Sequence, residues 1–318
     1  MSKFKTRIRK GQIIDGIINL DKPLGLSSNQ ALQKVKAILN AQKAGHTGAL
    51  DPLASGVLPL CFGHATKISS FLLDADKRYQ ATLQLGVTTN TGDKEGEIIH
   101  ESTVPEYSLE QLNQILDIFV GPQQQVPPMH SALKHQGQPL YKLARKGKEV
   151  ERQARDIIIY ELNLLDYAEN CLKIDVKCSK GTYIRTLAED IGQQLGCGAH
   201  LAALRRTEAG PFTLDNAHSI EEVSEFIQEE RLGEILLNSD IALQDYPSIY
   251  LQEDQTIDIK FGRKIALLTE QLLQIDKPIE QQKYRIYSQE QDFLGLGELS
   301  IEADGEDTVF LLPKRMFL

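Results

Sequence analysis

The chain has little of several features that define common protein classes. It contains no tryptophan, and its four cysteines form neither a CxxC pair nor a zinc-ligand spacing. A few cysteines without such patterns are typical of proteins in a reducing compartment. No apolar run approaches the roughly 20 residues that cross a bilayer, and no apolar segment follows the basic amino terminus. We therefore expect a cytoplasmic protein without a membrane partner.

Common motifs for cofactors and nucleophiles are also missing. The sequence has no GxGxxG after a strand, no phosphate-binding GxxxxGK[ST] and no GxSxG elbow, and its seven histidines form no HExxH. From the residues we expect neither a nucleotide cofactor nor a bound metal.

Charge is distributed unevenly along a chain whose net charge is −9. Residues 1–50 hold nine lysines and arginines against two acidic residues, whereas residues 201–318 hold eleven against 23. A basic face on an acidic protein can still bind RNA, with more dependence on shape than on overall charge.

The length of 318 residues and a change of texture predict two domains. Residues 1–245 mix strand and helix patterns, including an amphipathic helix in SSNQALQKVKAILN, residues 27–40, with a serine cap at its start. Short β patterns with glycine turns dominate residues 246–318. A Pro-, Gln- and Lys-rich stretch over about 124–155 interrupts the first domain, and we interpret it as an insertion that projects from the core.

A single acidic residue, Asp51, stands in the segment AGHTGALDPLASGVLPLCFG, residues 44–63. Pro52 directs Asp51 away from the α region, and Gly48 and Gly56 allow sharp bends. An ordinary Asp-Pro turn explains the pattern without chemistry. The alternative is a carboxylate held on a fixed loop for catalysis.

A second cluster lies in GTYIRTLAEDIG, residues 181–192. If 181–185 are extended, Tyr183 and Arg185 point to one side and Ile184 points into the core. An aromatic ring and a guanidinium on one side would suit a carboxylate nucleophile and a planar base. A surface Tyr–Arg stack explains the pattern equally well.

Several segments, in this order, resemble the successive motifs of the TruB-type family of bacterial tRNA pseudouridine-55 synthases. They are DKPLGLSS (21–28), GHTGALDPLASGVLP (45–59), KRYQATLQLGVTTNTGD (77–93), VPPMHSALKHQGQPLYKLARKGKEVER (126–152), GTYIRTLAEDIG (181–192) and HLAALRRTEAGPF (200–212).

The resemblance implies an α+β fold, in which helices flank a mixed, largely antiparallel sheet. It also implies that the insertion grips RNA and that residues 246–318 form a small β-rich, PUA-like RNA-binding domain.

The implied activity is that of an isomerase of the intramolecular transferase type. It flips uridine 55 out of the T-loop of tRNA, detaches uracil from C1′ and rejoins it through C5. The implied partner is the T-arm stem-loop of tRNA; we expect a monomer that uses no cofactor, metal or guide RNA.

The resemblance also assigns roles to individual residues. Asp51 matches the catalytic aspartate and Arg185 the arginine that orients it, whereas Tyr79 either stacks on the base or relays the C5 proton. Other pocket residues, the base-flipping residue and the motif behind the catalytic loop are Tyr183, Leu204, His46, Lys22 and Pro23. The expected contacts to the RNA backbone are Lys142, Arg145, Lys146 and Arg152.

Two other classes of function remain open at this point. An RNA-binding or RNA-chaperone protein without catalysis would share the basic insertion but would not require Asp51, Tyr79 and Arg185 together. A phosphotransferase with an aspartate nucleophile would need a metal-binding acid nearby, and GALDPLA contains no DxD. The residues leave open whether Asp51 attacks carbon or removes a sugar proton.

Overall fold

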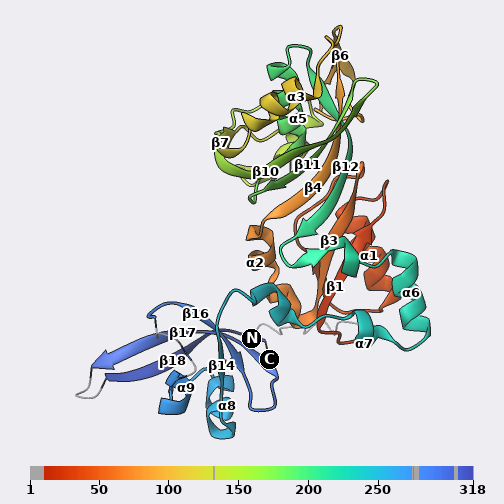
Figure 1. Ribbon diagram of the computed structural model, residues 1–318. Helices are drawn as coiled ribbons and strands as arrows, with labels where there is room; N and C mark the ends of the chain where they lie inside the picture. The colour runs from red at the N-terminus through yellow and green to blue at the C-terminus, as the bar shows by residue number, and fades with distance from the viewer. Residues whose placement is uncertain (1–10, 132, 274, 276–278, 304–306, 318) are drawn as a thin grey trace.

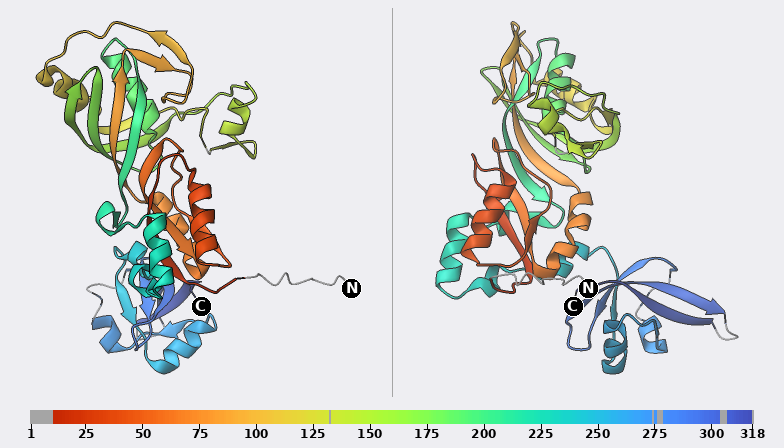
Figure 2. Two further views of the ribbon diagram at one scale, coloured as in Figure 1. Left: turned by 90° about the vertical axis from the view of Figure 1, so that its right-hand side faces the viewer. Right: turned by 180° about the vertical axis from the view of Figure 1, so that it is seen from behind.

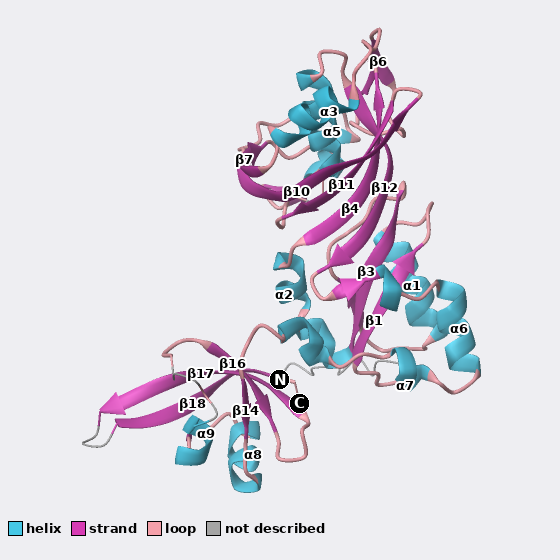
Figure 3. Ribbon diagram, viewed as in Figure 1, coloured by secondary structure: helices cyan, strands magenta, loops and turns pink. Residues whose placement is uncertain are grey.

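The computed structural model describes residues 11–131, 133–273, 275, 279–303 and 307–317. Within these residues the largest sheet has nine strands in the order β1-β3-β12-β4-β11-β10-β7, with β2 beside β3 and β13 beside β12. Every pairing is antiparallel except that of β12 with β3. The expected mixed, largely antiparallel sheet is confirmed (Figures 1 and 3). The strands are β1 (Gly16–Lys22), β2 (Ala44–His46), β3 (Ala54–Phe62), β4 (Lys77–Leu85), β7 (Gly121–Gln125), β10 (Arg155–Ala168), β11 (Cys171–Cys178), β12 (Ala199–Ala209) and β13 (Phe212–Thr213).

Helices cover the sheet at both ends and form separate apolar clusters with it. Helices α3 (Leu109–Asp117) and α5 (Ile184–Gln194) pack on the end made by β4, β11 and β10 (Figure 1). Helices α1 (Ser28–Ile38) and α6 (Ile220–Gln228) pack near β1 and β3. The predicted serine cap of α1 is confirmed, because the Ser27 hydroxyl accepts from the Gln30 amide. Shorter helical turns are η1 (Gly63–Lys67), α2 (Ser69–Asp74), η2 (Leu214–Asn216), α7 (Leu232–Ile235) and η3 (Ser239–Leu243).

The two ends of the sheet meet where β3 runs parallel to β12. Leu204, Arg205 and Arg206 pair with residues 54–56 across this junction. Gly56 has a φ of 103°, and a Cβ there would lie 2.1 Å from the Arg206 carbonyl oxygen. Only glycine permits so close an approach. The junction therefore holds the loop that precedes β3, which carries Asp51, against β12.

The stretch between β7 and β10 leaves the body of the molecule, as expected for the insertion (Figure 2, left). It contains a two-stranded ribbon of β8 (Lys134–His135) and β9 (Gln138–Pro139), followed by α4 (Leu140–Ala144). A second peripheral hairpin, β5 (Val87–Thr89) with β6 (Ile98–Glu101), projects beyond β4.

Residues 248–316 form a second sheet in the order β14-β16-β17-β18-β15, which confirms the β-rich carboxyl-terminal part. Helices α8 and α9 were not anticipated from the sequence, which predicted short β patterns for this region. The expected division after residue 245 falls between η3 and β14 and stays a prediction. The elements are β14 (Ser248–Tyr250), α8 (Glu253–Lys260), β15 (Ile265–Ala266), α9 (Thr269–Leu273), β16 (Lys283–Tyr287), β17 (Phe293–Ala303) and β18 (Asp307–Met316).

Residues 181–185 do not meet the condition under which Tyr183 and Arg185 would point to one side of an extended segment. Residues 181–185 are not a continuous extended segment, because α5 begins at Ile184 with Tyr183 as its N-cap residue. Arg185 therefore lies in the first turn of the helix, and it reaches the loop of Asp51 from there. No helix in the described part of the chain is long and apolar enough to cross a membrane.

Candidate active site

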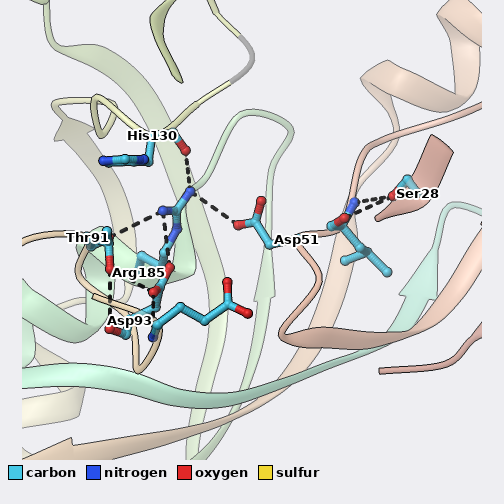
Figure 4. Close-up of polar contacts among 8 residues, drawn as sticks. Ser28, Asp51, Thr91, Asp93, His130 and Arg185 are labelled. Atoms are coloured by element: carbon cyan, nitrogen blue, oxygen red, sulfur yellow. Dashed lines mark hydrogen bonds and ion pairs between the residues drawn. The ribbon is translucent and has the colours of Figure 1, made fainter. Parts of the chain in front are cut away.

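On both sides of Asp51, the loop that carries it is hydrogen-bonded to the start of α1 or to the segment just before α1. The Ser28 hydroxyl accepts from the Leu50 amide at 2.7 Å and donates to the Leu50 carbonyl at 3.0 Å (Figure 4). The Gly25 amide donates to the Pro52 carbonyl at 2.8 Å. The Asp51 side chain nevertheless remains 52% exposed. A carboxylate on a fixed loop, open to a ligand, is the arrangement that the catalytic interpretation of Asp51 requires.

The Arg185 guanidinium is the hub of this site and is buried. Its Nη2 lies 3.2 Å from Asp51 Oδ2 and donates to the His130 carbonyl at 2.5 Å. Its Nη1 donates to Asp93 Oδ2 and to the Thr91 carbonyl, both at 3.3 Å (Figure 4). These contacts hold the planar Arg185 guanidinium in one orientation relative to the Asp51 carboxylate.

Asp93 is a site residue that the sequence analysis did not identify. It follows β5, and it is buried. Its Oδ1 accepts from the Thr91 hydroxyl at 2.7 Å and from the Glu95 amide at 3.1 Å. These bonds leave Oδ2 aimed at Arg185. The only signal in the sequence was the position of Asp93 at the end of the quoted segment KRYQATLQLGVTTNTGD.

Gln125, at the end of β7, sets the position at which α5 begins. Its side-chain oxygen accepts from the Tyr183 amide at 2.7 Å, and its side-chain nitrogen donates to the Tyr183 carbonyl at 3.1 Å. Gln125 is buried, so the pair is shielded from water. Through this contact β7 positions both Tyr183 and, two residues later, Arg185.

We expect Gln125→Ala to lower kcat about 10- to 100-fold with little change in KM, because a small displacement of catalytic groups is costly. Single-turnover kinetics on tRNA measure this effect. The matched control is Gln124→Ala, since Gln124 is exposed on the same strand and contacts Asp156 instead. Equal losses in the two variants would contradict a positioning role for Gln125.

The floor of the site is formed by adjacent strands β4 and β12. Tyr79 on β4 pairs directly with Arg206 on β12, and Leu204 pairs with Ala81. Tyr79 and Leu204 are half-buried and pack against the larger core. Tyr183, the N-cap residue of α5, is also half-buried. Burial raises the pKa of Tyr79 and that of Tyr183. The structure therefore brings the three expected pocket residues close to one sheet face beside Asp51.

Lys22, Pro23 and His46 lie behind and beside the loop of Asp51. Lys22 is fully buried, and its ammonium group donates to the Pro23 carbonyl at 2.8 Å and the Leu26 carbonyl at 2.6 Å. Burial lowers the pKa of Lys22 to about 8, although the negative charge of Asp51 acts to raise it. His46 is half-buried, and burial lowers its pKa. Its Nδ1 has no hydrogen-bond partner among the described residues.

The cations of the insertion divide into two groups. Lys142, Arg145 and Lys146 are exposed on and after α4, where phosphate groups could reach them. Arg152 is only half-exposed, and it donates to the Pro127 carbonyl at 3.3 Å and to Glu149 Oε1 at 3.1 Å. Arg152 thus joins the two ends of the insertion, so its guanidinium is already engaged within the protein.

No group of three or more His, Cys, Asp or Glu side chains in the described ranges is arranged to hold a metal ion. The site itself presents a carboxylate with guanidinium, ammonium and phenol groups around it.

Comparisons with known proteins agree along most of the chain. Family models match at residues 36–184 (TruB family pseudouridylate synthase, N terminal domain), 185–244 (tRNA pseudouridylate synthase B C-terminal domain) and 247–317 (Pseudouridine synthase II TruB, C-terminal). The tRNA pseudouridine synthase B of Pseudomonas aeruginosa is 50% identical over 92% of this chain and 94% of its own. That of Pseudomonas putida F1 is 50% identical over 98% and 97%.

Solved structures share the fold at lower identity. A Cbf5-Nop10-Gar1 complex matches with a TM-score of 0.73 and 25% identity over 96% of this chain and 86% of that one. An H/ACA RNP bound to a substrate RNA containing 2′-deoxyuridine matches with a TM-score of 0.71 and 22% identity, over 99% and 92%. The family models, the relatives of nearly equal length and the shared fold all point to the same family. We conclude that the chain belongs to the TruB family of pseudouridine synthases and is an isomerase.

Proposed function

We propose that this protein converts uridine 55 in the T-loop of tRNA to pseudouridine, as a monomer and without guide RNA, with Asp51 as the catalytic residue. The relatives that are half identical over nearly the whole chain are named tRNA pseudouridine synthase B, which supports tRNA as the substrate. One observation carries the assignment of Asp51. It is the only acidic residue in its loop, it is open to a ligand, and the buried Arg185 lies 3.2 Å away.

The reaction exchanges one bond for another within a single nucleotide. The N1–C1′ bond breaks, a C1′–C5 bond forms, and the proton that leaves C5 is balanced by one gained at N1. Either route to this product, attack at C1′ or removal of a sugar proton, needs a carboxylate beside the sugar. Asp51 supplies it, and Arg185 orients it through a charge-assisted contact.

The uracil must leave the folded loop before Asp51 can reach its sugar. Tyr79, Tyr183 and Leu204 offer a flat, partly apolar surface for the extruded base. His46 lies on β2 at the edge of the same loop, and we propose that it fills the place that the nucleotide leaves. Lys22 and Pro23 support the loop from behind through the carbonyl contacts described above.

We propose that the exposed cations of the insertion hold phosphates of the T-arm, which positions the RNA without reading its sequence. Arg152, which is half-exposed, is proposed to contact the RNA backbone as well, and its bond to the Pro127 carbonyl also holds the two ends of the insertion together. Residues 246–318 provide a PUA-like domain for a further RNA contact, with the boundary after residue 245.

The purified chain alone should modify an isolated T-arm stem-loop. At low RNA concentration its rate should fall steeply with salt, and neutralising Arg145 and Lys146 together should reduce that slope by about two. The rate at saturating RNA should stay within a few fold. The control replaces Lys173 and Arg231, which are ion-paired outside the insertion, and should leave the slope unchanged. A stem-loop modified only after cell extract is added would show that a partner supplies recognition.

A further inference from the structure

Arg206 is a buried cation that the proposed reaction has not yet used. Only 1% of its surface is exposed, and it lies on β12 at the junction with β3. Nε donates to the Val57 carbonyl at 2.7 Å and Nη2 to the Gly48 carbonyl at 3.0 Å. Among the residues with described positions, no carboxylate forms an ion pair with it. A guanidinium buried without a carboxylate is costly, and neutral carbonyls offset only part of that cost.

The group that faces Arg206 across the sheet is the phenol of Tyr79. The two residues are direct partners in the antiparallel pairing of β12 with β4, so their side chains share one face. The positive charge of the guanidinium opposes the effect of burial on the Tyr79 pKa. Other groups that feel the charge of Arg206 are Lys22, His46 and Lys77. Arg206 therefore lies near two lysines, Lys22 and Lys77, in a part of the site where negative charge would be stabilised.

We propose that Arg206 is a positioning residue for Tyr79: it aims the phenolic oxygen at C5 of the uracil and stabilises negative charge on that oxygen during proton transfer. The inference rests on the proposed function and adds a role for a residue outside the pocket. The hydrogen bonds from Arg206 to the Gly48 and Val57 carbonyls fix the position of the guanidinium. Because Gly48 precedes Asp51 and Val57 follows it, these bonds also connect Arg206 to the segment that carries Asp51.

The proton step balances within the nucleotide. After the C1′–C5 bond forms, the C5–H bond breaks and its electron pair restores the ring double bond. The phenolic oxygen accepts that proton as it releases its own toward N1, directly or through water, and N1 becomes protonated. Tyr79 ends as it began, and no oxidant or further reactant takes part. Negative charge appears on the phenolic oxygen only in passing, which is where a fixed guanidinium acts most strongly.

The test compares uridine with [5-²H]uridine at the target position of a T-arm stem-loop, in single turnovers at saturating enzyme. The variants are Arg206→Met, Arg206→Lys and Tyr79→Phe. Arg205→Met is the matched control, because Arg205 neighbours Arg206 on β12 but pairs with Asp21. We expect Arg206→Met to slow conversion about 10- to 100-fold, less than the roughly 100- to 10,000-fold that a positioned proton acceptor supplies, because Tyr79 itself remains. The remaining rate should show a primary deuterium isotope effect, and Arg206→Lys should restore part of the loss.

A merely structural role would slow the earlier cleavage of the N1–C1′ bond and would suppress the isotope effect. The inference would be overturned if the Arg206→Met variant converted uridine slowly but without an isotope effect. It would also be overturned if that variant kept the wild-type rate. The same holds if Arg205→Met gives the same rate loss and isotope effect. In the double variant with Tyr79→Phe, Arg206→Met should add less than a few fold. A wild-type chain that makes no pseudouridine would instead contradict the proposed function.

Discussion

Replacing Asp51 with asparagine should abolish pseudouridine formation while tRNA affinity stays within a few fold of wild type. Asparagine keeps the shape of the side chain and loses its charge and nucleophilicity. The RNA interface depends on other residues, so binding should survive. We expect the single-turnover rate to fall below about a hundredth of wild type, a loss of about 2.7 kcal/mol or more in transition-state stabilisation.

Ser28→Ala provides a useful comparison for Asp51→Asn. It removes the hydroxyl that ties Leu50 but keeps the carboxylate, so it should retain measurable activity. Turnover by Asp51→Asn above the stated limit would indicate another nucleophile. Loss of tRNA binding with that variant would instead assign Asp51 a structural role.

Arg185→Lys should lower kcat about 100- to 1,000-fold, with little change in the affinity for RNA. A lysine keeps the charge but lacks the planar fork, and it cannot meet Asp51, Asp93 and the His130 carbonyl in one geometry. The expected size follows from the loss of one preorganised donor in an active site. Burst and steady-state kinetics on tRNA separate this effect from slow product release.

Arg78→Lys is the matched control for Arg185→Lys. Arg78 is ion-paired with Asp175 and Glu161 on the neighbouring strands, away from Asp51, and its conservative replacement should change the rate less than two- to three-fold. An Arg185→Lys enzyme with near wild-type kcat would show that the charge near Asp51, rather than its fixed direction, is what matters.

Much of the local structure could be predicted because it depends on short-range signals. Ser27 caps α1 and Ser108 caps α3 through serine side chains followed by helical periodicity. The loop of Asp51 was recognisable because glycine and proline exclude both helix and strand there. The basic stretch after Gln125 was recognisable from composition, and it does leave the body of the molecule.

The residues that complete the site depend on long-range contacts, which single-sequence patterns do not contain. Asp93 meets Arg185 because a hairpin after β4 folds over the start of α5. Gln125 meets Tyr183 across 58 positions of sequence. In the sequence, nothing distinguishes Arg206 from the adjacent Arg205. Arg206 is buried because β12 pairs in parallel with β3, a contact that the sequence does not reveal. The expected contact of Arg152 with phosphate stays a prediction, but no sequence pattern indicated that this residue also joins the two ends of the insertion.

The central claim is that this chain alone isomerises uridine 55 and uses Asp51 to do so. The most direct test incubates the purified protein with an unmodified tRNA transcript and follows the nucleosides by mass spectrometry after digestion. Pseudouridine has the mass of uridine but resists cleavage of its carbon–carbon glycosidic bond, so the two are distinguished by fragmentation. We predict one pseudouridine per tRNA, at position 55, with wild-type protein and none with Asp51→Asn. Unchanged uridine at position 55 with the wild-type protein, or product formed equally well by Asp51→Asn, would contradict the account.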